Sequence, residues 1–422
     1  MSINNNIKFL LDLEEENIVE NNFLRNDYVV LKNGVTAKRI HFISSTKFYV
    51  CPFCGQIIYK LHDYRTVDLK YNSCGPQPLI VSIKKKRFEC EDCNKTITED
   101  LKCVKKHCFI SNKVYQSITF SLKKIDSLTD IANNHNVSTS TVYRSLQKVD
   151  NINLPNTLPS VLSFDEFKAN TSEGKYAFLV VDPINKSILE ILSDRKFSSV
   201  YKYFSRFNRK VRNRVKYIIS DLWEPYRQII LKLFPNATLV ADKFHYQRVV
   251  NVALNSVRKR ISNSLDNKTA YQIKRNWRLL NKNFDDINDK RRYFSHLLKR
   301  PVTDYEVLNY ILSLNSELAN AHSLYQDFLY IINLDNSEKQ IQLLDKWLEL
   351  AIKYNISEFD SVIKTIKKWY KPICSSFIKY EGRTLSNGFI EGCNNKIKVI
   401  KRVSFGYRSF INFRKRILLV FY

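Results

Sequence analysis

The 422-residue sequence lacks the features that define several common classes of protein. No segment reaches the roughly 18 to 20 apolar residues needed to span a bilayer, and the amino-terminal end is too acidic for a secretory signal. None of the eight glycines forms the GxxxxGKS or GxxxxGKT loop that cradles nucleotide phosphates. We therefore expect a cytoplasmic protein with no membrane partner, and the sequence gives no basis for ATP hydrolysis.

Acidic residues are also scarce relative to basic ones. Lys and Arg number 68 against 41 Asp and Glu, which gives a formal net charge of +27. A basic excess spread along the whole chain favours a polyanionic partner, and nucleic acid is the obvious candidate. The alternatives are a role in solubility alone, or an AT-rich coding sequence, which the many Asn, Lys and Ile residues suggest. At this length we expect roughly two to four globular units, because single cores stop growing near about 250 to 300 residues.

Seven of the nine cysteines fall within residues 51–108, where two CxxC pairs stand out: Cys51 with Cys54, and Cys90 with Cys93. Disulfides rarely persist in the cytoplasm, so these residues are expected to be thiols or metal ligands. Four thiolates suit one tetrahedral Zn²⁺, and the strand-like stretch between the pairs predicts a zinc ribbon. Unmetallated core cysteines are the alternative. The remaining candidates have irregular spacing and are expected to be free buried thiols rather than a second metal site: Cys74, Cys103, His107 and Cys108.

A helical stretch over residues 111–125 is followed by a segment, residues 127–149, whose apolar spacing suits two short packed helices. Ser138 is a good N-cap for the second of them. This pattern predicts a helix-turn-helix, with an ordinary helical hairpin as the alternative. The exposed face of the second helix suits base-edge and phosphate contacts in a major groove and is expected to carry Thr139, Ser140, Thr141, Arg144, Ser145 and Lys148.

From residue 160 onward, apolar runs of strand length alternate with helical segments. We expect helices after the third, fourth and fifth strands, and we place the strands at residues 161–167, 176–182, 188–193, 215–220 and 237–241. Three consecutive strands followed by alternating helices and strands match an RNase H-like core with a mixed sheet. Residues 246–379 read as almost entirely helical, which predicts an all-helical insertion before the last segment of this core.

Two of the expected strands end in acids, Asp165 and Asp221, and a third acid, Glu391, leads the polar face of a predicted helix. An Asp at the end of an apolar strand must be paired, metal-bound or at the solvent rim. Three carboxylates suit two hard divalent cations, Mg²⁺ or Mn²⁺, that bridge a scissile phosphate. Lys398 and Arg402 follow Glu391 on the polar face and are candidate DNA contacts. The competing acids are Asp182, Asp194, Glu166, Glu224 and Asp242.

On these motifs the sequence resembles the ISL-three (ISL3) group of bacterial insertion-sequence transposases over nearly the whole chain. The matching stretches are residues 51–55, 87–93, 163–167, 220–226, 241–245, 387–398 and 405–414. The resemblance implies a DDE fold with Asp165, Asp221 and Glu391 as metal ligands, a zinc ribbon at the amino end, and terminal inverted repeats as the DNA target. The first acid follows Ser163-Phe164, where family members more often carry glycine or isoleucine with valine.

His245 completes an Asp-x-x-His sequence that looks like a signature found after the fifth strand in several transposase groups. We take it as a candidate catalytic residue for phosphate or leaving-group contact, with a hydrogen-bonded core histidine as the alternative.

The sequence thus predicts an α/β protein whose catalytic core follows two amino-terminal DNA-binding modules. The expected division is an amino-terminal segment (1–47), a zinc ribbon (48–108), a helix-turn-helix domain (109–150), a linker (151–159), an RNase H-like catalytic domain (160–245 and 380–422) and a helical insertion (246–379). We expect a transposase that binds the terminal inverted repeats of an insertion sequence and catalyses metal-dependent strand cleavage and strand transfer. The alternatives are a catalytically inactive sequence-specific DNA-binding regulator and an RNase H-like nuclease without strand transfer. Double-stranded DNA is the expected partner, with a homodimer or larger assembly on it, and the protein is expected to be nucleoid-associated when bound.

Overall fold

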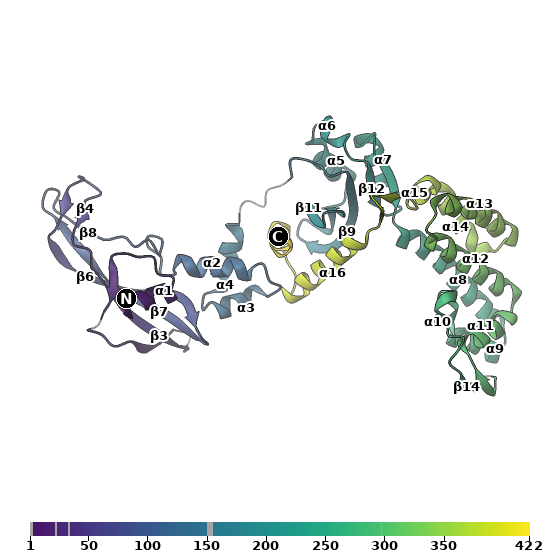
Figure 1. The fold of residues 1–422 in the computed structure, drawn as a ribbon, viewed down its shortest axis with the longest axis horizontal. Helices are drawn as coiled ribbons and strands as arrows, with labels where there is room; N and C mark the ends of the chain where they lie inside the picture. Colours follow the sequence, from purple (N-terminus) through teal and green to yellow (C-terminus); the bar gives the residue numbers. More distant parts are fainter. Residues whose placement is uncertain (1–2, 22, 33, 150–154, 297) are drawn as a thin grey trace. The chain divides into compact units, whose positions relative to one another are not determined.

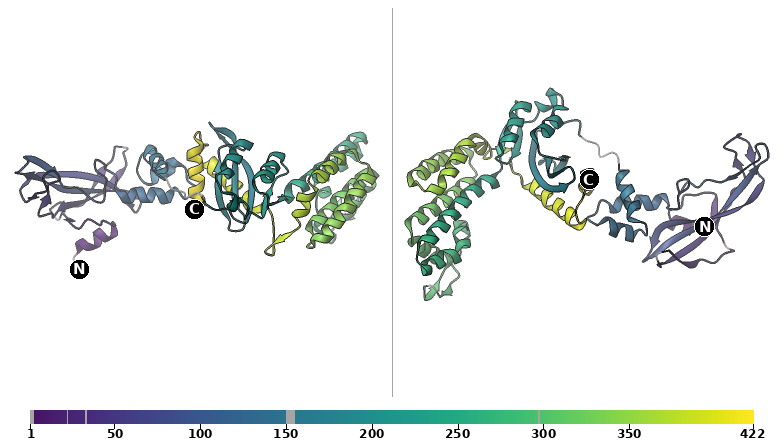
Figure 2. Two further views of the ribbon diagram at one scale, coloured as in Figure 1. Left: turned by 90° about the horizontal axis from the view of Figure 1, so that it is seen from above. Right: turned by 180° about the vertical axis from the view of Figure 1, so that it is seen from behind.

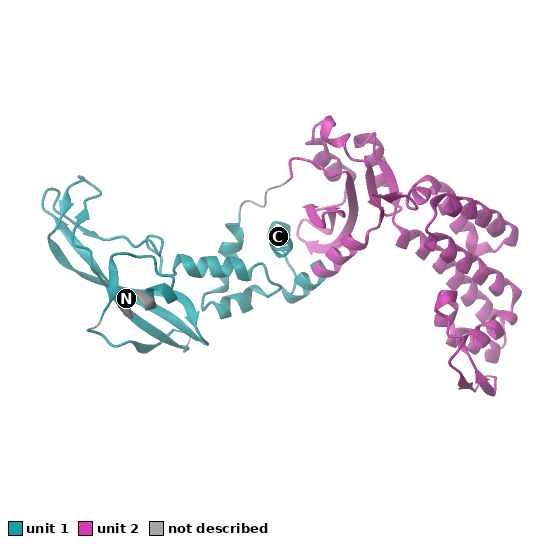
Figure 3. Ribbon diagram, viewed as in Figure 1, with its two compact units in different colours: residues 1–153, 397–422 teal, residues 154–396 magenta. Residues whose placement is uncertain are grey.

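The computed structural model describes residues 3–21, 23–32, 34–149, 155–296 and 298–422 (Figure 1). The chain divides into two compact units: unit 1 holds residues 1–153 and 397–422, and unit 2 holds residues 154–396 (Figure 3). The expected linker at 151–159 lies outside the described residues up to position 154. Within the described ranges, no helix combines the length and apolar character that a membrane span requires.

Unit 1 contains a six-stranded sheet and a small hairpin, which the two views of Figure 2 show from further sides. The sheet follows the order β1-β3-β7-β6, with β2 paired to β3 and β8 paired to β7. Its elements, with the preceding helix, are α1 (Ile3–Leu10), β1 (Ile18–Glu20), β2 (Asp27–Val30), β3 (Thr36–Ser44), β6 (Leu61–Cys74), β7 (Gln77–Cys90) and β8 (Lys95–Thr98); the hairpin is β4 (Tyr49–Val50) with β5 (Ile57–Ile58). Leu79, Val81 and Ile83 alternate along β7 and pack in one core with Phe42 of β3.

The boundary expected at residue 47 falls inside this sheet. Strand β3 lies before that boundary, yet it pairs in parallel with β7 from Lys38–Leu79 to Ile43–Lys84. The expected amino-terminal segment and zinc ribbon therefore share backbone hydrogen bonds. Pairing between strands about 40 residues apart in the chain is set by side-chain packing, and local sequence patterns do not reveal it.

The second part of unit 1 is helical. It comprises α2 (Asn112–Ser121), α3 (Leu128–Asn134), α4 (Thr139–Gln147) and α17 (Phe410–Phe421). The predicted helices on both sides of the turn are confirmed, and Ser138 accepts a hydrogen bond from the backbone N–H of Thr141 as the N-cap of α4. Leu419 of α17 packs in the same core as Ile118, Ile131 and Val142.

The C-terminal helix is also tied to the helical part of unit 1 by a buried arginine. Arg416 of α17 donates to the backbone carbonyl oxygens of Leu122, Lys124 and Asp126, which follow the end of α2. Residues 380–422 were expected together in the catalytic domain, but the division into units falls within α16 (Gly388–Val403), and residues 397–422 belong to unit 1.

Unit 2 is built on a five-stranded mixed sheet in the order β11-β10-β9-β12-β13. Strand β10 is antiparallel to both of its neighbours, whereas β9, β12 and β13 run parallel. The elements are β9 (Val161–Thr171), β10 (Gly174–Asp182), β11 (Ser187–Leu192), α5 (Phe197–Ser205), α6 (Arg209–Arg212), β12 (Tyr217–Ser220), α7 (Glu224–Leu233) and β13 (Thr238–Ala241). The strands and following helices expected from the sequence are confirmed. Phe164, Phe178 and Phe204 stack in the core between sheet and helices, with centroids of adjacent rings 5.2 to 6.5 Å apart.

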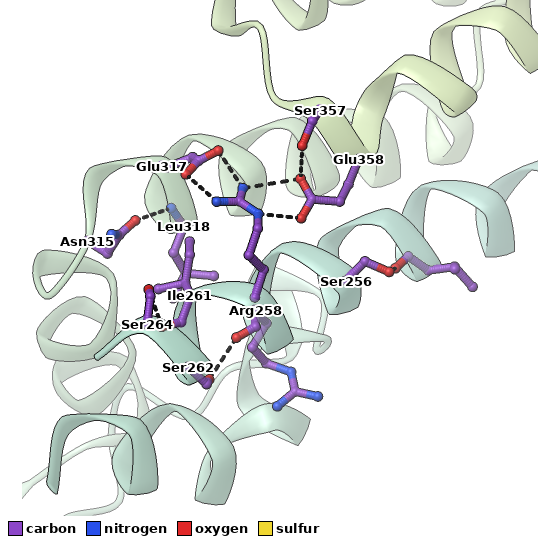
Figure 4. A network of polar contacts seen from close by, with 12 residues as sticks. Ser256, Arg258, Ile261, Ser262, Ser264, Asn315, Glu317, Leu318, Ser357 and Glu358 are labelled. Atoms are coloured by element: carbon purple, nitrogen blue, oxygen red, sulfur yellow. Dashed lines mark hydrogen bonds and ion pairs between the residues drawn. The ribbon is translucent and has the colours of Figure 1, made fainter. Parts of the chain in front are cut away.

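A mainly helical segment follows β13. Its helices are α8 (Lys243–Ser264), α9 (Asn267–Arg275), α10 (Trp277–Leu280), α11 (Asp304–Ser313), α12 (Ser316–Asn333), α13 (Ser337–Tyr354), α14 (Asp360–Lys368) and α15 (Tyr370–Ser375), with short 3-10 turns at Phe284–Asp286 and Ser357–Phe359. Arg260 of α8 bridges Glu317 and Glu358 at 2.6 and 2.7 Å, and Figure 4 shows these two carboxylates directed toward one guanidinium.

The prediction that this segment is all-helical was wrong at one place. Strands β14 (Tyr293–Ser295) and β15 (Arg300–Val302) form a short antiparallel hairpin between α10 and α11. Pro301 cannot donate a backbone hydrogen bond within a helix, and Lys299 adopts a positive φ of 52°, so a helix cannot continue through this stretch. A second two-stranded hairpin, β16 (Lys379–Tyr380) with β17 (Arg383–Thr384), precedes α16.

Candidate active site and metal centres

Three acids of unit 2 meet at one edge of the parallel part of the sheet. Asp165 lies in β9, Asp221 directly follows β12, and Asp242 directly follows β13. Ser163 pairs with Ile219, so the same parallel offset places Asp165 level with Asp221. The last residue pair of β12 and β13 directly precedes Asp221 and Asp242. Sheet register alone therefore brings the three carboxylates side by side.

His245 lies in the first turn of α8, three residues after Asp242. Its Nε2 atom is 2.9 Å from Asp221 Oδ1 and 3.6 Å from Asp242 Oδ2. Potential ligand atoms of Asp221, Asp242 and His245 all lie within 4.8 Å of one another, the spacing of residues that can hold one metal ion. Asp165 and Glu391 are not part of this tight group. Sequence reasoning had placed Asp242 only among the competing acids.

Glu391 reaches the same region from the first turn of α16. Asn394, one helical turn further on, donates from Nδ2 to Asp165 Oδ2 at 2.6 Å. Ser163 of β9 donates to Asn387, just before the helix. These two hydrogen bonds hold the beginning of α16 against β9, and the charge of the exposed Glu391 side chain acts on Asp242.

The electrostatics show how closely these carboxylates interact. Burial, followed by the charge of Asp221, raises the pKa of Asp165 to about 7. Burial also raises the pKa of Asp242 to about 6, and the charges of Asp221 and Glu391 add to this effect. Burial opposes the charged form of His245, but its hydrogen bond to Asp221 and the surrounding carboxylates raise its pKa overall. Asp165, Asp221 and Glu391, which the sequence singled out, are thus linked through mutual repulsion.

The donor set fits divalent cations. Two buried oxygen atoms in the cluster, Asp221 Oδ1 and Asn394 Oδ1, make no hydrogen bond of acceptable geometry with any described residue. A buried acceptor without a donor is costly, and so are several carboxylates facing one another. Hard cations such as Mg²⁺ prefer oxygen ligands of this kind and would relieve both penalties.

The other competing acids are engaged elsewhere. Asp182 accepts two backbone N–H groups in the turn after β10. Asp194 accepts hydrogen bonds at the start of α5, Glu224 forms an ion pair with a lysine of α14, and Glu166 forms an ion pair with Arg195. These contacts give each of them a structural role.

A cleft of about 520 Å³ opens beside this cluster within unit 2. Its walls combine three kinds of side chain: the acids Glu166 and Asp221 with His245, the cations Arg195, Lys364 and Lys368, and the apolar or aromatic residues Leu222, Trp223, Val249 and Trp369, along with Thr365. Sequence reasoning did not assign a site role to Arg195 or Trp223. The signal for Trp223 was its position two residues after Asp221.

The four predicted zinc ligands meet in unit 1. The sulfur atoms of Cys51 and Cys93, and those of Cys54 and Cys90, are each 3.5 Å apart, and all four lie within 4.8 Å of one another. Four sulfurs at 2.3 Å from a tetrahedral zinc would be about 3.8 Å apart, so the cluster fits the ion. Against burial, the backbone N–H groups of Cys54 and Phe53 lower the pKa of the Cys51 thiol to about 6, which favours the thiolate that zinc binds.

The leftover residues form no further group of potential metal ligands in the part of the chain that the structure describes. Burial and the nearby Glu15 raise the pKa of Cys103 to about 12. The expectation of buried thiols was wrong for Cys74, which is exposed in the turn between β6 and β7.

The candidate DNA-contacting face of α4 is only partly exposed. Thr139, Ser140, Arg144 and Lys148 are exposed, but Thr141 is 4% and Ser145 6% exposed, so the expectation for these two was wrong. The Ser145 hydroxyl donates to the Thr141 carbonyl oxygen at 2.9 Å, and the Thr141 hydroxyl lies 3.0 Å from that of Ser138. This side of α4 continues the stripe of Val142 and Leu146 into the core. Lys398 and Arg402 on α16 are exposed.

Comparison with known families places the chain among the transposases, because residues 162–417 match a family model that carries the description "Transposase". The chain belongs to the ISL3 family of DDE transposases.

Individual relatives agree with this family. The transposase for insertion sequence element IS1001 of Bordetella parapertussis is 23% identical over 380 residues, which cover 88% of each chain. The transposase for insertion sequence element IS1557 of Mycobacterium tuberculosis is 21% identical over 247 residues, 56% of this chain and 54% of the relative. A Lactococcus lactis protein described as an ATP-dependent protease is 29% identical over 140 residues, 33% of this chain and 41% of that protein.

Proposed function

We propose that this protein binds the terminal inverted repeats of an insertion sequence and catalyses metal-dependent DNA strand cleavage and strand transfer. The observation that carries the proposal is the convergence of acids on one sheet edge. Asp165 and Asp221 lie level on adjacent parallel strands, and the Asn394–Asp165 hydrogen bond holds the helix of Glu391 beside them.

Asp165, Asp221 and Glu391 would hold the divalent cations, two Mg²⁺ or Mn²⁺ ions. When bound, such ions activate an attacking oxygen and stabilise the leaving oxygen, so that water first and a 3′-hydroxyl afterwards can attack a phosphodiester. Asn394 orients the Asp165 carboxylate through its amide N–H. His245 lies with Nε2 beside Asp221 and is the candidate for phosphate or leaving-group contact.

The fold supports the same proposal. A sheet in which three antiparallel strands lead into parallel strands with intervening helices suits an RNase H-like core, with residues 246–379 as its insertion. The four-cysteine cluster supports a zinc ribbon with one structural Zn²⁺, and α3 and α4 support a helix-turn-helix that places Thr139, Ser140, Arg144 and Lys148 on DNA. Lys398 and Arg402 are further candidate DNA contacts.

The domain boundaries proposed from the sequence are kept with two changes. We propose that residues 1–47 complete the ribbon sheet, and that residues 397–422 act with the helix-turn-helix domain, since they pack in unit 1. The target of the protein is double-stranded DNA in the bacterial nucleoid, both the element's repeats and the insertion target. Two element ends must be joined, so we propose a homodimer or larger assembly on DNA.

Purified full-length protein, incubated with Mg²⁺ and a DNA that carries the inverted repeats flanking this reading frame, tests the proposal. We expect cuts at the repeat ends and joined products. Asp221→Asn should abolish both while repeat binding persists, and Asp194→Asn, which keeps an acceptor oxygen at the start of α5, should leave both intact. Binding without cuts would instead indicate a regulator, and cuts without joined products a nuclease.

A further inference from the structure

The cleft beside the carboxylates contains more than a phosphate site needs. Phosphates are bound by cations and N–H groups, and Arg195, Lys364 and Lys368 supply such cations here. The floor, however, includes Leu222, Trp223 and other apolar side chains. An apolar and aromatic floor gives nothing to a phosphate but suits a flat, uncharged ring.

Trp223 lies where such a ring would have to be. It is two residues beyond Asp221, and its indole packs edge-on against Tyr226 with centroids 4.6 Å apart. The guanidinium carbon of Arg195 lies 5.0 Å from the Trp223 ring centroid and 4.4 Å from that of Tyr176. Rings held by neighbouring rings and a cation make a stacking platform that loses little freedom when a ligand binds.

Arg195 is itself fixed. It forms an ion pair with Glu166, whose other oxygen accepts a hydrogen bond from the Tyr226 hydroxyl at 3.0 Å. The platform of Trp223 and Arg195 is thus connected to β9 one residue after Asp165. The volume of about 520 Å³ lies within the range of about 300 to 1,000 Å³ found for small-molecule pockets, so one nucleobase with its sugar can enter.

We propose that this cleft accepts one unpaired nucleobase of the DNA next to the cut and stacks it on Trp223. The inference rests on the proposed function, because it takes the substrate to be a DNA end. Extruding a base costs binding free energy, and stacking on an aromatic side chain offsets that cost whatever the base. The extruded base would bend the strand at the position where the carboxylates act.

The test uses full-length wild-type protein without divalent metal, so that binding is measured without cleavage. Duplexes carrying the element end receive, at each position around the cut in turn, either a mismatched thymine or an abasic sugar. Neither needs unpairing, and only the thymine can stack. At one position we expect the mismatched duplex to bind roughly tenfold more tightly, the equivalent of about 1.4 kcal/mol and within the range for stacking of one base.

Protein variants assign this difference to the platform. Trp223→Ala should bring the two affinities together, and Trp223→Phe, which keeps an aromatic face, should retain most of the difference. Trp277→Ala is the matched control, because Trp277 is 45% exposed and also lies under an arginine, with Arg278 5.6 Å from its ring centroid. It should behave as wild type.

Equal affinities of wild type for the two duplexes at every position would overturn the inference, and so would a Trp223→Ala protein that keeps the difference. The comparison between duplexes needs no protein variant, so a misfolded Trp223→Ala chain would not rescue the idea. Asp221→Asn should lose cutting but keep the difference. A wild-type protein that shows the difference but never cuts would contradict the proposed function alone.

Discussion

Replacing Asp165 by asparagine should stabilise the metal-free protein while abolishing its activity. Burial and the charge of Asp221 raise the pKa of Asp165 from 3.8 to about 7. An acid whose pKa is raised by folding contributes stability that is present at low pH and is lost as pH rises from the unfolded value toward the folded one. An amide resembles the protonated acid, so Asp165→Asn removes this loss.

The magnitude follows from the two pKa values. About three units at 1.36 kcal/mol each give about 4 kcal/mol at pH 8, falling to about 2 kcal/mol at pH 5. The geometry tolerates the change, because the unpaired Asn394 Oδ1 can accept from the new amide after Asn394 rotates by half a turn. Mg²⁺ should stabilise the wild type at pH 8 and have little effect on Asp165→Asn.

Urea unfolding at pH 8 and pH 5 with a chelator present measures both effects. All four tryptophans, at positions 223, 277, 347 and 369, lie in unit 2, so their fluorescence reports on the unit that holds the cluster. Asp194→Asn is the control and should change stability little at either pH. The reasoning is refuted if Asp165→Asn destabilises the unit at pH 8, or if its gain is the same at both pH values.

Three further outcomes are expected elsewhere in the chain. Elemental analysis should find one zinc per chain in the wild type and in Cys74→Ser, but none in Cys90→Ser, whose ribbon should exchange its amide hydrogens rapidly; zinc retained in Cys90→Ser would contradict the four-thiolate site. Arg416→Ala should destabilise the end of α2 by about 1 to 3 kcal/mol, seen as faster exchange of its amide hydrogens, because three carbonyl oxygens lose their donor. In titrations with repeat DNA, Arg144→Ala should weaken binding by about 1 to 3 kcal/mol, whereas the isosteric Thr141→Val should bind as wild type, since Thr141 is buried; a loss with Thr141→Val would restore it as a contact.

Local patterns predicted the catalytic half of the fold well. The strands around Asp165 and Asp221 are short apolar runs of the right period, and an acid at the end of such a run is conspicuous. The membership of Asp242 could not be predicted in this way. Among 41 acids many triads are conceivable, and only the register of β12 with β13 shows that Asp242 lies level with Asp221.

Long-range packing explains what the sequence did not reveal. Arg416 bonds to carbonyl groups some 290 residues earlier in the chain, so nothing near it in the sequence indicates that the C-terminal helix joins unit 1. The burial of Thr141 has a similar cause. Its short polar side chain suits an exposed helix face, but the face is decided by the neighbours packed around α4.

The central claim is that carboxylates from β9, β12 and α16 together hold catalytic divalent cations. Anomalous diffraction from crystals of the full-length protein soaked in Mn²⁺ tests this claim most directly. We expect manganese peaks among the carboxylates of Asp165, Asp221 and Glu391, and their loss in Asp221→Asn. Manganese held only by Asp242 and His245, or no manganese in unit 2 at all, would contradict the claim.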